Sequence, residues 1–175
     1  MAMVTGKPLF SAEQIQKKVR ELADRITRDY DGKDMVAVCI LSGAFMFFSD
    51  LVRSIRIPIK VDFVTCSSYV KTDTTGEVTI HSDIREDIKG KHVLLVEDIA
   101  DTGITLNFLR EHYSQRGPLG IKICSLLDKR ARRTVDIPID YAGFSIPDEY
   151  VVGYGLDYSN RFRNLPYISV FKKSV

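Results

Sequence analysis

The sequence has no dominant charge. Its 25 Lys and Arg residues nearly balance its 23 Asp and Glu residues, so the formal net charge is only +2. Proteins that bind nucleic acid or anionic membranes usually carry a clear basic excess, and we therefore expect neither partner. The 175 residues, 45% hydrophobic and 27% charged, have an ordinary globular composition and suffice for one domain with a substantial core.

Cysteine is scarce, and long apolar segments are missing. Cys39, Cys66 and Cys124 lie far apart in apolar runs and form no C-x-x-C pair. This pattern argues against a disulfide framework or a zinc site and favours reduced, buried thiols. No segment is long enough to span a membrane, and residues 1–10 lack the apolar core of a signal peptide. We therefore expect a cytoplasmic protein.

Helix and strand patterns alternate along the chain. A capping box opens at Ser11, with Gln14 three residues later, and apolar residues then recur at helical spacing as far as Ile26. The remaining apolar runs predict helices over residues 44–55 and 104–113 and strands over residues 35–41, 59–66, 121–127, 141–145 and 150–154, with a further strand opening at residue 93. Alternation of this kind favours a parallel α/β sheet in a single domain.

Residues 70–83 offer little to bury. A turn signal, Thr-Asp-Thr-Thr-Gly-Glu, lies at residues 72–77. The segment is either an exposed hairpin or a mobile lid, and composition does not separate these alternatives.

The most informative stretch runs from residue 93 to residue 106. Its Val- and Leu-rich start predicts a strand buried on both faces, which should leave the core where Glu97 and Asp98 appear. Asp101 follows in a turn, and residues 102–105 supply hydroxyls, a glycine and the free amides of a helix start. In an open parallel sheet, ligands bind outside the carboxyl ends of the strands, so these groups should line a site.

These residue types suit a sugar phosphate. The amides of a helix start hold phosphate, Glu97 and Asp98 can contact a ribose diol or Mg²⁺, and Asp101 can act as a general base. In the alternative interpretation, Asp101 or Thr102 only caps the next helix. Three carboxylates within five positions favour the ligand site. Neither a G-x-G-x-x-G nor a G-x-x-x-x-G-K-[ST] pattern is present there, which disfavours Rossmann and P-loop sites.

Two later stretches could complete such a site. Residues 128–133 form a basic cluster; most such clusters are solvated surface, but this one follows a predicted buried strand. Beyond Pro138, short strands with aromatic residues could roof a pocket and give a flat ligand an apolar face.

Five segments in order carry a resemblance to a known family: Leu41–Gly43, Ser68–Tyr69, Val93–Leu106, Leu127–Arg130 and Pro147–Tyr158. They resemble the type I phosphoribosyltransferases, and more closely the hypoxanthine-guanine phosphoribosyltransferases. The resemblance implies an α/β fold with a central, mostly parallel sheet flanked by helices. It implies one domain over residues 1–175, with a core of about 10–135, a small C-terminal hood of 136–175 joined by N-terminal residues, and a flexible lid loop of about 68–83.

The resemblance implies a site for ribose and 5′-phosphate. Glu97 and Asp98 would hold the ribose hydroxyls, directly or through Mg²⁺, and Asp101 would be the general base near purine N7. The 5′-phosphate would bind to residues of the following loop and helix start: Asp101, Thr102, Gly103, Ile104 and Thr105.

The purine site implied by the resemblance draws on the C-terminal third of the chain. Lys129 would donate to the purine O6, and Tyr150 would stack on the base. The backbone of Val151 and Asp157 would face the pyrimidine edge of the base. Asp157 would also ligate a second Mg²⁺, and Arg163 would meet pyrophosphate.

The pyrophosphate loop departs from the family pattern. Many relatives have Lys or Arg where this chain has Ser42, between Leu41 and Gly43. The resemblance places a non-proline cis peptide at Leu41–Ser42, and the amides of Ser42 and Gly43 could still bind pyrophosphate without the side-chain charge. Ser68 and Tyr69 would begin the lid.

The implied activity is purine salvage. A phosphoribosyl group would pass from phosphoribosyl pyrophosphate to a 6-oxopurine with Mg²⁺ as cofactor, in a homodimer or homotetramer. The alternative is an RNA-binding regulator of the pyrimidine-operon type, which shares this fold. The near-neutral charge, Lys129 and Tyr150 favour the enzyme.

Overall fold

The computed structural model describes residues 3–4, 7–69 and 77–172. The helices are α1 (Ala12–Asp29), α2 (Phe45–Ser54) and α3 (Ile104–Ser114), with a 3-10 turn at Arg130–Arg132. The strands are β1 (Met3–Val4), β2 (Met35–Leu41), β3 (Lys60–Tyr69), β4 (Glu77–Ser82), β5 (His92–Ala100), β6 (Gly120–Asp128), β7 (Tyr141–Ser145), β8 (Val151–Val152) and β9 (Ser169–Lys172). The predicted helices are confirmed, as is the capping box of Ser11 and Gln14.

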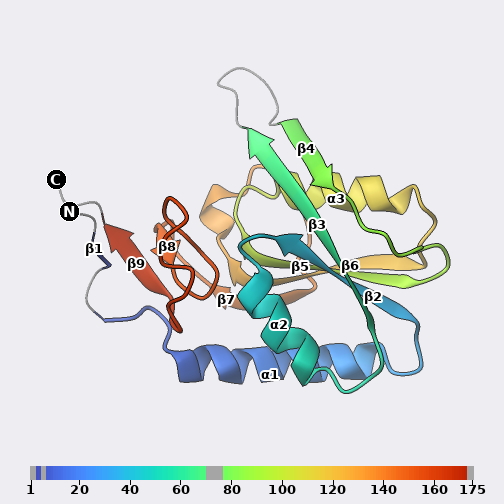
Figure 1. Ribbon diagram of the computed structural model, residues 1–175, viewed down its shortest axis with the longest axis horizontal. Helices are drawn as coiled ribbons and strands as arrows, with labels where there is room; N and C mark the ends of the chain where they lie inside the picture. The colour runs from blue at the N-terminus through green and yellow to red at the C-terminus, as the bar shows by residue number, and fades with distance from the viewer. Residues whose placement is uncertain (1–2, 5–6, 70–76, 173–175) are drawn as a thin grey trace.

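Six strands form the central sheet in the order β4-β3-β2-β5-β6-β7. Neighbouring strands pair in parallel except β3 and β4, which pair antiparallel. Helices α1 and α2 lie on one face of this sheet and α3 on the other (Figure 1). The predicted α/β class with a mostly parallel, helix-flanked sheet is therefore confirmed.

Strand β2 shows why the central strands are continuously apolar. Met35, Ala37 and Cys39 belong to the core cluster under α1 and α2, while Val36 and Val38 belong to the cluster under α3. Successive side chains of a strand point to opposite faces. A strand covered on both faces therefore needs an apolar residue at every position, and β5 follows the same rule over its first half.

Strand β5 is longer than its sequence indicated. It extends to Ala100, so Glu97 and Asp98 lie within the strand and not where it leaves the core. The ladder to β6 continues through these acids, since Glu97 pairs with Ser125 and Ala100 with Asp128. The hydrogen bonds between strands are made by backbone N–H and C=O groups and not by side chains, so the strand continues through the two carboxylates.

Strand β7 corrects the expected hood boundary. We expected residues 136–175 in the hood, but β7 pairs in parallel with β6 and forms one edge of the central sheet. Tyr141 is buried in the core, and its hydroxyl donates to Asp29 at the end of α1 (2.6 Å). The strand is short and rich in aromatic residues, and its partner cannot be read from local pattern.

A second sheet of order β1-β9-β8 lies at one end of the molecule (Figure 1). It joins the start and the end of the chain, because β1 pairs antiparallel with β9. Strand β8 is shorter than the predicted 150–154, since Gly153 and Tyr154 have φ values of 103° and 51° and turn the chain. No helix among the described residues is both long and apolar enough to cross a membrane.

Candidate functional site

Two adjoining cavities open at the carboxyl ends of the central strands. The larger has a volume of about 510 Å³ and lies between the central sheet and the β8 region, and the smaller, of about 250 Å³, lies beside the start of α3. Ser68, Ile99, Asp101 and Arg132 line both. Parallel strands end at a common edge, so residues far apart in sequence meet here.

Most of the sequence-predicted site residues line these cavities. The larger cavity contacts Gly43, Ser68, Asp98, Asp101, Lys129, Tyr150, Val151, Asp157 and Arg163. The smaller cavity contacts Ser68, Glu97, Asp101, Thr102, Gly103 and Thr105. Leu41, Ser42 and Ile104 line neither cavity, and the side chain of Tyr69 lies outside the described residues.

Glu97 and Asp98 face different cavities, as the alternation of a strand requires. Backbone amides hold both carboxylates: Asp98 N donates to Glu97 Oε1 (3.0 Å), and Ile99 N donates to Asp98 Oδ1 (2.7 Å). Burial raises the pKa of Glu97 well above its usual value, and the charge of Asp98 raises it further. Burial also raises the pKa of Asp98. A bound cation or sugar hydroxyls would relieve this pair of buried acids.

The start of α3 is open to the smaller cavity. Gly103 is the N-cap, with a φ of 86°, and no side chain caps the helix. The side-chain hydroxyl of Thr102 accepts a long local contact from Ile104 N (3.4 Å) and does not cap the helix. The alternative in which Asp101 or Thr102 serves as the N-cap is therefore wrong. An uncapped helix start beside a cavity suits an anion such as phosphate.

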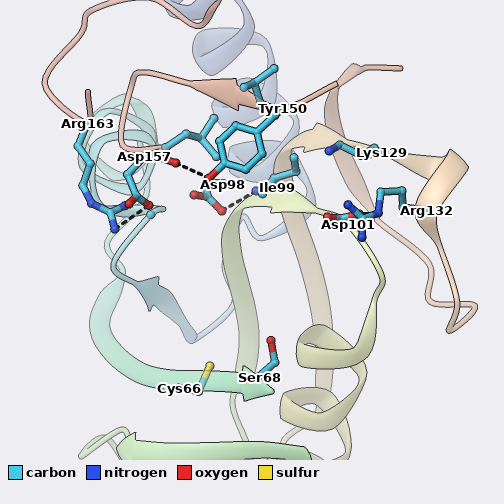
Figure 2. A pocket seen from close by; sticks show the side chains of 13 residues that line it. Cys66, Ser68, Asp98, Ile99, Asp101, Lys129, Arg132, Tyr150, Asp157 and Arg163 are labelled. Carbon is cyan, nitrogen blue, oxygen red and sulfur yellow. Dashed lines mark hydrogen bonds and ion pairs between the residues drawn. The ribbon is translucent and has the colours of Figure 1, made fainter. Parts of the chain in front are cut away.

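Asp101 lies where the two cavities meet. Its Oδ1 is buried and has no hydrogen-bond donor among the residues that the structure describes. The guanidinium of Arg132 lies beside it, with its Nε 3.6 Å from this oxygen. Figure 2 shows the two side chains together at one side of the larger cavity. A buried carboxylate oxygen without a donor is costly, so Asp101 is prepared to accept a proton or a hydrogen bond from a ligand.

The opposite wall of the larger cavity suits a flat polar ring. Tyr150 is 53% exposed, and its hydroxyl donates to the carbonyl of Asp157 (2.9 Å). The Lys129 side chain is only 7% exposed, with its Nζ 3.6 Å from Asp148. Arg163 pairs with the Asp157 carboxylate (2.9 Å). Figure 2 shows Tyr150 between Asp157 and Lys129. An aromatic face beside an ammonium donor fits a ring bearing an oxygen acceptor.

Two glycines let the loops around the larger cavity approach each other. A Cβ on Gly43 would overlap the carboxylate of Asp98, and a Cβ on Gly155 would overlap the carbonyl of Gly43. The Leu41–Ser42 peptide is cis, as expected from the sequence. The Gly43 backbone thus lies against both Asp98 and the turn after β8.

The lid expected over residues 68–83 is described only in part. Its ends are β3 and β4, which pair antiparallel, for instance Ser68 with Val78. Residues 70–76, with most of the predicted turn, lie outside the described residues. Ser68 lines both cavities.

Sequence reasoning missed four residues that line the larger cavity: Cys66, Ile99, Arg132 and Leu156. Cys66 lies two positions before Ser68 on β3, so strand alternation could have placed it. Burial raises the pKa of the Cys66 thiol to about 11. All three cysteines are free, as expected, but the expected burial holds only for Cys39 and Cys124, because Cys66 is half-buried. Arg132 belonged to the basic cluster that we interpreted chiefly as solvated, and no local signal separated it from Arg130.

Comparisons with known proteins agree with this geometry. Residues 7–159 match the family model described as the phosphoribosyl transferase domain. The chain is 51% identical over 167 residues to a hypoxanthine phosphoribosyltransferase of Salmonella typhimurium, covering 94% of each chain. It is 43% identical to the hypoxanthine-guanine-xanthine phosphoribosyltransferase of Tritrichomonas foetus, covering 95% of this chain and 92% of that one. A crystal structure of a hypoxanthine-guanine phosphoribosyltransferase from Bacillus anthracis superposes with a TM-score of 0.93 at 44% identity, covering 99% of this chain and 100% of that one.

Proposed function

Since the chain belongs to the phosphoribosyl transferase family, and within it to the hypoxanthine phosphoribosyltransferases, we propose that it acts in purine salvage. It transfers the 5-phosphoribosyl group of phosphoribosyl pyrophosphate to N9 of hypoxanthine or guanine, giving IMP or GMP and pyrophosphate. Xanthine is a third candidate base, because the relative from Tritrichomonas foetus is named for it.

The position of Asp101 carries this proposal. Its Oδ1, which has no hydrogen-bond donor among the described residues, lies between a cavity beside the uncapped start of α3 and a cavity walled by Tyr150 and Lys129. A sugar phosphate in the first cavity and a purine in the second would present their reacting atoms beside this carboxylate. A general base must lie within hydrogen-bond reach of the proton it accepts.

Each wall has a distinct task in this proposal. The amides and hydroxyls of Asp101, Thr102, Gly103, Ile104 and Thr105 bind the 5′-phosphate, although Ile104 contributes only its backbone. Asp101 accepts the purine proton as the bond between C1′ and N9 forms and the bond between C1′ and pyrophosphate breaks. Positive charge developing on the ribose is stabilised by the carboxylates of Glu97 and Asp98. These side chains are already in position, so they do not have to reorganise when the charge develops.

The base is selected by the opposite wall. Lys129 donates a hydrogen bond to the purine O6. A 6-aminopurine carries an amino donor at that position and cannot accept this bond in the same way. Tyr150 stacks on the ring, and the backbone of Val151 and Asp157 faces its pyrimidine edge. Pyrophosphate leaves against Arg163 and the backbone of Leu41, Ser42 and Gly43, while Ser68 and Tyr69 begin a lid that excludes water from the reacting carbon.

Magnesium fits the residues present. The candidate ligands Glu97, Asp98 and Asp157 offer the hard carboxylate oxygens that Mg²⁺ prefers, and burial raises the pKa values of the first two. No group of three or more acidic, His or Cys side chains that could hold a metal occurs among the described residues. Substrate oxygens would therefore complete the coordination, as is usual for Mg²⁺. When bound, the ion would neutralise charge on pyrophosphate.

We further propose a homodimer or homotetramer in the cytoplasm. Phe45 of α2 and Val61 and Phe63 of β3 are 38% to 46% exposed, and Phe63 contacts Phe48, one turn from Phe45. An exposed apolar surface of this kind suits a second copy of the chain. Free cysteines agree with a reducing compartment. Light scattering that gave a monomer at micromolar concentration would exclude the assembly.

The activity is tested with purified protein, Mg²⁺, phosphoribosyl pyrophosphate and each of hypoxanthine, guanine and xanthine. We expect a nucleoside monophosphate from at least one base and none from adenine. Absence of product with every 6-oxopurine, together with salt-dependent RNA binding, would instead support the RNA-binding regulator, which the near-neutral charge disfavours.

A further inference from the structure

Arg133 donates hydrogen bonds to the backbone of the loop that contains Asp101, and it lines neither of the two cavities. Its Nη2 donates to the carbonyl of Ala100 (3.1 Å) and its Nε donates to the carbonyl of Asp101 (3.0 Å). Its Nη1 donates to the carbonyl of Ile137 (3.2 Å). A planar guanidinium with a fixed fork of donors can hold several acceptors at once, which a lysine ammonium cannot reproduce.

The next two residues continue the same contact. The amides of Thr134 and Val135 both donate to the carbonyl of Thr102 (3.0 Å each), and Thr134 Oγ1 lies 3.2 Å from the same oxygen. We call residues 133–135 the brace. It binds three successive carbonyls, those of Ala100, Asp101 and Thr102.

This arrangement fixes where the loop amides point. The only cis peptide among the described residues is Leu41–Ser42, and in a trans peptide the N–H points opposite to the C=O of the same unit. The carbonyls of Ala100, Asp101 and Thr102 face the brace, so the amides of Asp101, Thr102 and Gly103 face away from it. These three residues line the smaller cavity, where successive amides form an anion-binding concavity.

Arg133 is itself anchored to the end of β6. Its side chain is 14% exposed, and its Nη2 lies 2.6 Å from Oδ1 of Asp128, whose side chain is 4% exposed. The guanidinium thus pairs with one buried carboxylate and donates to three backbone carbonyls, and these contacts together fix the orientation of the Arg133 side chain. The guanidinium therefore ties the carboxyl end of β6 to the loop after β5.

From these contacts we infer that Arg133 is the positioning residue of the phosphate-binding loop: it holds the carbonyls of Ala100 and Asp101 so that the amides of Asp101 and Thr102 are presented to the anion in the smaller cavity. It touches neither cavity and acts only through the loop. That the anion is the 5′-phosphate of the substrate rests on the proposed function.

Arg130 provides a matched control. It pairs with the other oxygen of the same carboxylate, with its Nε 2.9 Å from Asp128 Oδ2. Its side chain is 82% exposed, and among the described residues its guanidinium pairs with Asp128 and with no carbonyl of the Asp101 loop. Loss of Arg130 therefore removes an Asp128 partner while leaving the brace in place.

The test compares Arg133→Lys, Arg133→Ala and Arg130→Ala. Equilibrium binding of ribose 5-phosphate is measured by calorimetry, and KM is measured for phosphoribosyl pyrophosphate and for hypoxanthine. We expect both Arg133 variants to weaken ribose 5-phosphate binding and to raise KM for phosphoribosyl pyrophosphate by roughly ten- to a hundredfold, as for other supporting residues. KM for hypoxanthine should change by less than about threefold. Arg130→Ala should match the wild type.

Chemical rescue separates positioning from general stability. A cavity of about 340 Å³ lined by Asp128, Arg130 and Arg133 adjoins the guanidinium, so guanidinium ion at low millimolar concentration should restore much of the ribose 5-phosphate affinity of Arg133→Ala, while equal urea should not. Thermal unfolding reports the folded fraction. Should Arg133→Ala fail to fold, Arg133→Lys decides the question alone.

The inference is overturned if folded Arg133→Lys binds ribose 5-phosphate like the wild type, or if its KM values for both substrates rise equally. A wild type that does not bind ribose 5-phosphate would also overturn it. Binding of ribose 5-phosphate that depends on Arg133, without IMP or GMP formation, would sustain the positioning role and sink the proposed function.

Discussion

The hydroxyl of Tyr150 donates to the backbone carbonyl of Asp157 at 2.9 Å. This bond joins the ring that we propose stacks on the purine to the carbonyl that we propose faces the pyrimidine edge of the purine. Tyr150 also contacts Tyr158 and Phe171 at ring distances of 5.9 Å. A hydrogen bond therefore connects the proposed stacking ring to the carbonyl that would accept the 2-amino group of guanine.

Tyr150→Phe should shift the choice of base. The variant keeps the ring but removes the hydroxyl that donates to the Asp157 carbonyl. That carbonyl is then available to accept a hydrogen bond from the 2-amino group of guanine. We expect kcat/KM for guanine relative to hypoxanthine to rise by roughly two- to fivefold, the value of one neutral hydrogen bond. Steady-state rates with both bases measure this ratio. Tyr167→Phe serves as the control, because Tyr167 lines neither cavity. An unchanged ratio would show that the Tyr150 hydroxyl moves aside when the base binds.

Asp101→Asn should separate chemistry from binding. The amide is isosteric with the carboxylate but cannot accept the purine proton, and general bases typically contribute about 10² to 10⁴ in rate. We expect kcat to fall within that range while KM for phosphoribosyl pyrophosphate and the affinity for ribose 5-phosphate change by less than about threefold. Turnover close to that of the wild type would remove Asp101 from the role of base.

Gly43→Ala should disturb the pyrophosphate side of the site. A Cβ on Gly43 would overlap the carboxylate of Asp98, so either that carboxylate or the loop must move. Displacement of a reacting group by about 1 Å can cost on the order of a hundredfold in rate, and we expect a loss of kcat/KM of that size for phosphoribosyl pyrophosphate. Gly120→Ala is the control, because its nearest new neighbour would lie 3.9 Å away. Comparable losses in both variants would contradict the expectation.

The part of the site that is local in sequence could be predicted, and the part that depends on distant backbone could not. The strand and helix around Glu97, Asp101 and Thr105 were identifiable because apolar period, carboxylates and turn residues all lie within fourteen positions. Arg133 looked like a solvated charge because its partners, the carbonyls of Ala100 and Asp101, lie more than thirty positions earlier. Its burial follows from tertiary contacts, which a charge pattern does not encode.

The fold shows the same division. The strands β2 and β6 were predicted from apolar runs that a doubly covered strand requires. The position of β7 in the sheet depends on its pairing with β6. Its contact with α1, the hydrogen bond from Tyr141 to Asp29, likewise joins residues 112 positions apart. Short strands have too few residues for their pattern to specify a partner.

Asp83 joins the end of the β3–β4 hairpin to α3. Its carboxylate accepts a hydrogen bond from Tyr113 Oη (2.9 Å), lies 3.1 Å from Nε2 of His112 and pairs with Arg116. Burial alone would raise the pKa of Asp83, but hydrogen bonds from Arg116, His112 and Tyr113 and from a backbone amide lower it to about 2. Asp83, the last residue of the proposed lid segment, is thereby joined to the helix that begins at the phosphate-binding loop.

Asp83→Asn should reduce the dependence of stability on pH in acid. An aspartate in the unfolded chain has a pKa of about 3.9, so the folded-state pKa of about 2 is the lower, and the stabilisation is complete above the unfolded value and lost as the pH falls through 2. A shift of this size corresponds to about 2.5 kcal/mol, which solvent screening of a one-third exposed group reduces to roughly 1 kcal/mol. Urea unfolding between pH 5 and pH 2 should therefore show the difference between wild type and variant shrinking by about that amount. The exposed Asp31, changed to Asn, is the control, and a difference that stays constant over this range would show that the bonds of Asp83 do not depend on its charge.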